Sequence, residues 1–210
     1  NVNMFLFLKN IYSIKFKIEE DTTTINIERL DNELVLKKND NIEAKWLIKT
    51  IVLKVPDLLK DELKSDPNVP KKLKDTENIE LTLAIKKGDH SLEKLSQNEN
   101  LLYAYLPTDE KRYSLPILVN STFLTSSNRE SLHNDSKWNQ WLFKSISVEL
   151  FKWVAILVKE KYQEQAYRLI PKKLDIKNDN LSKAYNEGID EAIKSIAFIL
   201  SKENELLKVE

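Results

Sequence analysis

The chain has 210 residues, which is enough for one or two domains with a sizeable core. Lys and Arg total 33 and Asp and Glu total 33, so no net charge attracts the whole molecule to nucleic acid or to a membrane surface. The absence of cysteine excludes disulfides, thiol catalysis and cysteine-bound zinc, and two histidines, His90 and His133, disfavour a transition-metal site. No apolar run is long enough to cross a bilayer, and we expect a cytoplasmic protein without a membrane partner.

Two further features of the sequence indicate parts that this chain lacks. The first residue is Asn1 and not methionine, so we expect the chain to be a segment of a longer protein. Its two glycines, Gly88 and Gly188, are too few for a glycine-rich phosphate-binding loop. This excludes a complete nucleotide pocket of that kind.

Strand patterns dominate the first half. Residues 12–18 alternate apolar and polar side chains, which predicts a strand with Tyr12, Ile14, Phe16 and Ile18 together on one face. The alternation returns on both sides of a predicted turn at Asp31-Asn32, which favours an antiparallel meander. Further strands are expected at 25–27, 34–36, 44–55, 81–85, 101–106 and 115–119.

Helical patterns follow. Pro56 ends a strand, 57–64 predicts a short helix, and 65–78 is expected to be a mobile, lysine-rich connection. From Asp135 the apolar period changes to three and four, which predicts a long buried helix capped by Asp135 or Ser136. After a break at Pro171, a second long helix is predicted over 181–199, capped by Asp179 or Asn180.

The order of strands first and helices last predicts an α+β fold, in which long helices cover one face of a largely antiparallel or mixed sheet. We expect one domain over 1–210. It divides into a sheet-rich part (1–119), a polar loop (120–134) and a helical part (135–210).

The polar loop carries the most informative residues. A predicted buried strand at 115–119 leads through Ser121–Thr125 to Arg129 and then to Trp138-Asn139. Taken alone, Ser127 to Glu130 fits a capping box, with serine as the helix cap and glutamate reaching back to it. Arg129 would then project from the positive end of a helix dipole, which is suited to a phosphate. Trp138 and Trp141, three residues apart, are predicted to be core.

The run 115–133, the Trp138-Asn139 pair and the opening 6–14 together resemble the middle segment of sacsin-like proteins and ninety-kilodalton heat-shock chaperones, which are GHKL ATPases. In these ATPases a preceding Bergerat-type domain holds the nucleotide, and an arginine of the next segment reaches the terminal phosphate. The resemblance implies that Arg129 is this arginine. Asn128 precedes it where the chaperones have serine, and His133 stands in the place of an assisting glutamine.

The resemblance also implies the function and the partners. The chain would be a middle, transducer-like segment that couples ATP hydrolysis to conformational change, with its own N-terminal ATPase domain as first partner. A homodimer and a protein client are further expected partners. ATP and Mg²⁺ would belong to the full-length protein, with none bound tightly by this segment, which alone should not hydrolyse ATP.

An alternative is a non-catalytic module that binds a protein or nucleic acid, for instance in a bacterial defence system. Basic and aromatic residues mix between 159 and 173, as in surfaces that contact phosphates and stack bases. Glu160 and Glu164 lie within this segment, and with the overall neutrality they favour a solvated helix end. The residues concerned are Lys159, Lys161, Tyr162, Tyr167, Arg168, Lys172 and Lys173.

Overall fold

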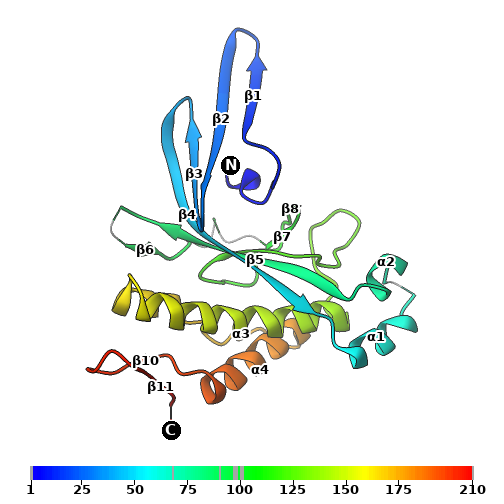
Figure 1. Cartoon of the computed structure of the whole chain (residues 1–210). Coiled ribbons are helices and arrows are strands. Elements are labelled where there is room, and N and C mark those ends of the chain that lie inside the picture. Colours follow the sequence, from blue (N-terminus) through cyan, green and yellow to red (C-terminus); the bar gives the residue numbers. More distant parts are fainter. Residues whose placement is uncertain (1, 68, 90, 97–98, 100–101, 210) are drawn as a thin grey trace.

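The structure is a computed structural model that describes residues 2–67, 69–89, 91–96, 99 and 102–209 (Figure 1). It is an α+β fold built on a mixed, largely antiparallel sheet, in which the only parallel pair between the described strands joins β7 and β9. The strand order is β1-β2-β3-β4-β5-β9-β7-β8, with β6 paired to β5. The strands are β1 (Ser13–Ile18), β2 (Asp21–Leu30), β3 (Glu33–Lys38), β4 (Asn41–Lys54), β5 (Asn78–Lys87), β6 (Leu92–Glu93), β7 (Leu102–Ala104), β8 (Leu106–Pro107) and β9 (Leu118–Asn120).

The helices lie mostly after the sheet, and a small separate hairpin follows them. Within the described residues, no helix combines the length and apolar character that a membrane span requires. The helices are α1 (Asp57–Lys64), α2 (Lys71–Lys74), α3 (Lys137–Lys159) and α4 (Asn180–Ser195), with 3₁₀ turns η1 (Val2–Phe5) and η2 (Gln163–Leu169); β10 (Ile199–Leu200) pairs with β11 (Leu206–Leu207).

The central strands are buried on both faces, each by a different part of the chain. Successive side chains of a strand point to opposite faces. On β4, Trp46 therefore joins a cluster with the N-terminal segment, whereas Leu47 joins the cluster that contains the helices. On β5, Ala84 and Leu83 divide in the same way.

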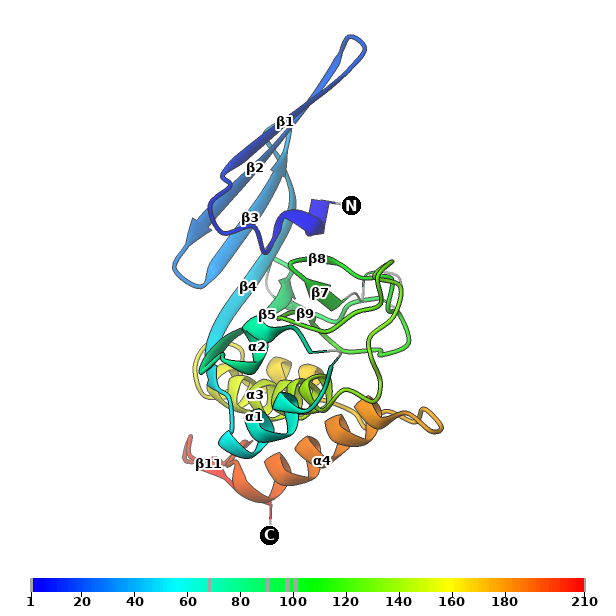
Figure 2. The same cartoon turned by 90° about the vertical axis from the view of Figure 1, so that its right-hand side faces the viewer.

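The helical layer covers one face of β4 and β5, and α4 lies on the far side of α3 (Figures 1 and 2). Ile146 of α3 is fully buried among the inward side chains of the sheet. The helices approach closely at Gly188, where an added Cβ would lie 2.1 Å from Ser147 Oγ. That hydroxyl donates to Tyr185 O over 2.9 Å, so glycine and serine together set the spacing of α3 and α4.

The N-terminal segment covers the other face. The opening residues 6–11 form turns and no strand, and β1 begins only at Ser13. Arg29 of β2 fastens these turns, donating to Leu8 O over 2.6 Å and to Ile11 O over 3.0 Å. Burial lowers the pKa of this guanidinium. The side chains that complete the cluster are Phe5, Leu6 and Phe7 with Ile25, Ile27, Leu34, Leu36, Tyr103 and Leu118.

Most predicted elements are confirmed, but the apolar face predicted for the first strand is largely exposed. Tyr12, Phe16 and Ile18 are 65%, 42% and 74% exposed. The reason is spatial, because the β1–β2 hairpin projects beyond the helices and past the N-terminal segment (Figure 2). Alternation therefore identified the strand correctly but not what lies against it.

The helix predictions need two corrections. Ser136 and Asp179 are confirmed as caps of α3 and α4, accepting from Asn139 N and Ser182 N. The second helix ends at Ser195 and not at Ile199, because the following residues extend into the β10–β11 hairpin. The predicted mobile connection 65–78 contains the short helix α2 and a core residue, Val69.

Replacing Ile146 by alanine should lower the free energy of unfolding by about 2 to 5 kcal/mol, since a cavity would remain between sheet and helices. Ile156 is the matched control: it lies on the same helix and is 43% exposed. Ile156→Ala should cost about 1 kcal/mol or less. Chemical denaturation of both variants measures the difference. Equal losses would contradict the placement of α3 against the sheet.

Candidate functional site

The loop between β9 and α3 forms a small hairpin. Thr125 and Leu132 pair as an isolated antiparallel bridge, and Ser126 N donates to Ser131 O over 2.9 Å. Arg129 N donates to Ser126 O over 2.9 Å and closes the turn. The predicted capping box at 127–130 is therefore wrong, because these residues form the hairpin turn and α3 begins only at Lys137.

Arg129 has an unusual backbone at the tip of this hairpin. Its φ is 61°, in the left-handed region, which costs a non-glycine residue about 1 to 2 kcal/mol. Asn128 supports the turn, since its side-chain oxygen accepts from Ser126 Oγ over 2.7 Å and from Glu130 N over 3.3 Å. The strained position is therefore held by the turn's own hydrogen bonds.

The side chain of Arg129 rests against the end of β7. Its Nη1 donates to Ala104 O over 3.3 Å, and its backbone oxygen accepts from Asp109 N over 3.1 Å. The predicted position at the positive end of a helix dipole is thus wrong. Among the described residues, the other guanidinium N–H groups have no partner, and the side chain is only partly buried. They are free to bind an external acceptor.

The other three arginines of the sequence are placed differently. Arg29 binds backbone carbonyls under the N-terminal segment, and Arg112 binds the carboxylate of Glu110 through two nitrogens, over 2.8 and 2.7 Å. Arg168 is exposed in η2. Arg129 alone combines a fixed position with donors that described residues leave unused.

A buried ionic network anchors the base of the hairpin. Glu110 is buried, and it also accepts from Leu132 N over 3.4 Å. Hydrogen bonding to Glu110 raises the pKa of Arg112. The Arg112 guanidinium also lies 3.8 Å from the carboxylate of Asp179, the buried cap of α4, which accepts from Tyr113 Oη over 3.0 Å. The loop is thereby connected to the helical layer.

Sequence patterns gave no sign of this network. Glu110 and Arg112 lie in a polar stretch with Asp109 and Lys111, which is typical of a solvated loop. Nothing in the local pattern distinguishes the buried carboxylate from its exposed neighbours. A bidentate pair two residues apart could have been suggested only by knowing that the chain turns there.

His133 lies at the base of the hairpin, away from the contacts of Arg129. Its Nε2 is 3.0 Å from Thr125 O, and its backbone N donates to Leu124 O over 3.0 Å. It precedes the cap of α3 and is not a first-turn helix residue. It borders a pocket of about 220 Å³ with Asp66 and Asp135. No hydrogen bond within the described part of the chain joins His133 to Arg129.

A larger pocket, of about 530 Å³, adjoins the anchor of Arg129. Tyr105 follows Ala104 directly, lines this pocket and also has a left-handed backbone, with φ 66°. Its N–H donates to Asn120 Oδ1 over 2.9 Å. Two strained residues, Tyr105 and Arg129, therefore meet at one turn. Also lining the pocket are Phe7, Leu8, Lys9, Lys72, Leu73, Thr76, Asn78, Ile79, Glu80, Ser121 and Thr122.

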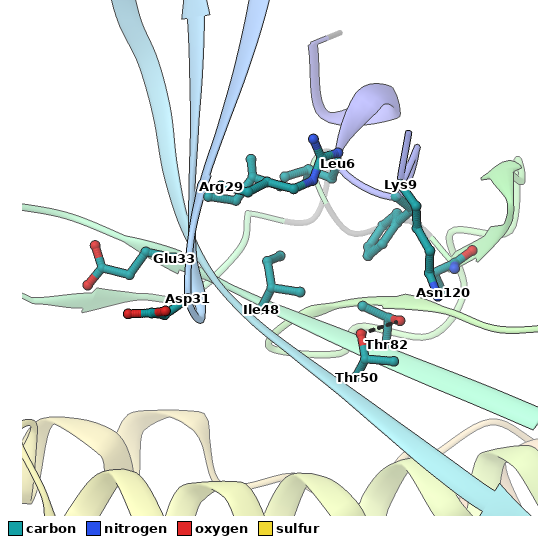
Figure 3. Close-up of a pocket in the computed structure, with 11 residues that line it drawn as sticks. Leu6, Lys9, Arg29, Asp31, Glu33, Ile48, Thr50, Thr82 and Asn120 are labelled. Atoms are coloured by element: carbon teal, nitrogen blue, oxygen red, sulfur yellow. Dashed lines mark hydrogen bonds between the residues drawn. The ribbon is translucent and has the colours of Figure 1, made fainter. Parts of the chain in front are cut away.

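A third pocket, of about 210 Å³, continues from this one along the face of the sheet opposite the helices and shares Phe7, Lys9 and Asn120 with it (Figure 3). On its floor the hydroxyls of Thr50 and Thr82 are hydrogen-bonded over 3.1 Å. Lys9 forms an ion pair with Glu80, which offsets its positive charge. The two pockets together carry hydroxyls, amides, ammonium groups and the carboxylates of Asp31, Glu33 and Glu80.

ATP and Mg²⁺, the cofactors expected from the resemblance, need different kinds of side chain. Arg129 and Lys72 are cations of the kind that bind phosphate oxygens. Mg²⁺ needs oxygen ligands, usually carboxylates, in a near-octahedral arrangement. In the part of the chain that the structure describes, no group of three or more His, Asp or Glu side chains is placed to hold a metal ion; His90 lies outside that part. Arg129 and Lys72 therefore fit a role toward phosphate.

Several aromatic and basic residues of the last third have structural contacts. Trp138 is confirmed as core, fully buried and packed on Trp141 at 5.3 Å between ring centroids. The hydroxyl of Tyr167 donates to Phe198 O and accepts from Leu200 N, and Lys173 pairs with Asp190 over 2.7 Å. Within the 159–173 segment, the side chains of Tyr167 and Lys173 therefore already have partners inside the molecule.

Comparison with known proteins finds no matching family model, no matching curated protein and no matching solved structure.

Replacing Glu110 by alanine should loosen the hairpin, because Leu132 N and the Arg112 guanidinium lose their acceptor. We expect a loss of about 1 to 3 kcal/mol in stability, since Arg112 is half exposed and can return to water. Faster amide hydrogen exchange at Leu132 would report the local effect. Glu130→Ala is the control, because that side chain is exposed on the same hairpin. Unchanged exchange at Leu132 in Glu110→Ala would refute the anchoring role.

Proposed function

We propose that this chain is the middle segment of a cytoplasmic ATPase related to sacsin-like proteins and ninety-kilodalton heat-shock chaperones. In this proposal Arg129 contacts the terminal phosphate of ATP that a separate N-terminal domain holds. The observation that carries the proposal is the placement of Arg129, which is fixed by its turn and by Ala104 O while no described residue accepts from its other side-chain donors.

The chemistry of the side chain supports this role. A guanidinium offers N–H donors in a planar fork that can bind two phosphate oxygens at once. Charge develops on the transferred phosphoryl group, and an arginine supplied by a neighbouring domain stabilises it. A donor held in position before the reaction needs no reorganisation during it, which makes the strained turn useful.

Asn128 and His133 take different parts. Asn128 acts as a positioning residue, since its side-chain oxygen holds the turn in which Arg129 stands. His133 is proposed to assist at the phosphate when the domains dock. Arg129 at the tip of the hairpin and His133 at its base make separate contacts. The proposed role of His133 therefore requires both the tip and the base to face the nucleotide.

The remaining expected partners follow from this proposal. The N-terminal ATPase domain would provide the adenine pocket and the ligands of Mg²⁺, and hydrolysis would be coupled to movement of this segment. Dimerisation and a protein client belong to the same proposal, as does a cytoplasmic location. A non-catalytic interaction module is the second candidate, and the exposed apolar side chains of the projecting β1–β2 hairpin favour it.

The 210-residue chain should bind ATP weakly or not at all, because Arg129 and nearby lysines can hold phosphates but form no enclosed adenine pocket. Calorimetric titration with ATP and Mg²⁺ measures this. A micromolar dissociation constant would contradict the proposal that a separate N-terminal domain holds the nucleotide.

In the full-length ATPase, Arg129→Ala should slow hydrolysis at least about tenfold while ATP affinity stays nearly unchanged. Arg129→Lys should restore only part of the rate, because lysine retains the charge but loses the planar fork. Turnover and nucleotide affinity are measured on the same preparations.

Arg168→Ala is the matched control, since Arg168 is exposed and makes no hydrogen bond or ion pair with a described residue. It should leave turnover unchanged. Equal turnover in the Arg129→Ala variant and the unaltered protein would refute the catalytic role and leave the interaction module as the better proposal.

A further inference from the structure

Strand β1 is an open edge of the main sheet. Among the described strands it pairs only with β2, and the hairpin that they form projects beyond the rest of the fold (Figures 1 and 2). The unpaired edge of a strand offers a row of N–H and C=O groups to another strand. The neighbouring parts of the molecule leave this edge accessible.

The register shows which groups face outward. Ile27 N donates to Tyr12 O over 2.8 Å, and Ser13 lies opposite Asn26. Hydrogen-bonded and non-hydrogen-bonded pairs alternate in an antiparallel ladder. The backbone groups of Ile14, Phe16 and Ile18 therefore point toward β2, and those of Ser13, Lys15 and Lys17 point away from the sheet.

The side chains of β1 divide between two faces with different chemistry. Ile14, Phe16 and Ile18 share one face and become more exposed toward the tip, where Ile18 is 74% exposed. Lys15 and Lys17 are exposed on the other face, and neither forms an ion pair with a described residue. An added strand would meet an apolar row on one side and a positive row on the other.

We propose that β1 binds an extended segment of another protein in which acidic and apolar residues alternate. The segment would add to the sheet as a further strand, with main-chain hydrogen bonds to Ser13, Lys15 and Lys17. Its acidic side chains would lie opposite the two lysines, and its apolar side chains opposite Ile14, Phe16 and Ile18. Opposite charges and apolar pairs directly across a ladder both stabilise it.

The same geometry disfavours a second copy of this chain. In the two antiparallel registers that give the longest overlap of two β1 edges through their outward groups, Lys15 lies opposite Lys15 or Lys17 of the other copy. Like charges directly opposite destabilise a sheet. The lysines therefore protect the edge against self-association while leaving it open to an acidic strand.

A membrane surface also fits poorly. The tip of the hairpin carries Glu19, Glu20 and Asp21, which an anionic lipid surface would repel. The exposed side chains closest to the tip are thus surrounded by negative charge. A protein strand that runs along the edge, beside Lys15 and Lys17, avoids this repulsion.

The test uses the whole 210-residue chain and two fluorescent peptides of about eight residues, one alternating Glu and Val and the other alternating Lys and Val. Fluorescence anisotropy at low ionic strength measures the affinity of each. The Glu-Val peptide should bind saturably and at least about tenfold more tightly than the Lys-Val peptide.

Three variants separate the contacts. Lys15→Glu combined with Lys17→Glu should reverse the preference between the peptides. Lys15→Pro removes an outward N–H and leaves the pairing with β2 intact, because proline is tolerated where an edge N–H faces solvent. It should weaken the Glu-Val peptide by at least about tenfold. Lys183→Glu, which changes an exposed lysine of α4, is the control and should bind like the unaltered chain.

Circular dichroism and the melting temperature show whether each variant is folded. If Lys15→Pro does not fold, the change in peptide preference of the charge-reversal variant decides the test. Absence of saturable binding to the unaltered chain would overturn the proposal. So would equal affinity for both peptides, or an unchanged preference after charge reversal. The readout involves no nucleotide, so the proposal can fail or succeed independently of the role of Arg129.

Discussion

The burial of both faces of β4 is the constraint on which the rest of the molecule depends. Trp46 and Leu47 are neighbours in the chain, yet each belongs to a different apolar cluster. A shift of one residue in the pairing of β4 with β5 would turn each side chain to the opposite face, so Trp46 and Leu47 would both lose the cluster in which they pack. The register from Lys45↔Lys87 to Lys54↔Asn78 is therefore held by packing on two sides. β4 is long enough to pair with β3 in the projecting part of the sheet at one end and to lie over the helical layer at the other (Figure 1).

This rigid sheet determines where the arginine loop can lie. β9 pairs with β5 and with β7, so the loop that follows it begins at a defined place beside the β7–β8 turn. Arg129 reaches back to the end of β7, and Glu110 holds the base of the hairpin. Asp179 connects the same network to α4. A loop attached at its tip and at its base presents a side chain more accurately than a free loop would.

The two ends of the molecule differ in character. Around Arg129, the left-handed backbone at Tyr105 and Arg129 is held by hydrogen bonds to Asn120 Oδ1 and Ser126 O. At the β1–β2 hairpin, Lys15 and Lys17 form no ion pair with a described residue, and Phe16 and Ile18 are 42% and 74% exposed. One end is thus suited to a defined contact with a charged group, and the other to pairing with an added strand.

Local patterns were sufficient for most elements. The period of two identified β1, and an apolar run ended by Pro56 indicated β4. The period of three and four identified α3, and at each helix start one of two candidate caps, Ser136 and Asp179, is the cap. Each of these signals depends on near neighbours in the chain. The Ser127–Glu130 stretch matched a cap pattern equally well but closes a hairpin turn, since Thr125 pairs with Leu132. The same limit explains Phe16, whose alternation was clear while its exposure depended on how far the hairpin extends past the N-terminal segment. The sequence could not indicate the roles of Glu110, Arg112 and Ala104. Their contacts join residues that approach one another only when β7, β9 and α4 pack together. Patterns between near neighbours in the chain contain no information on such distances.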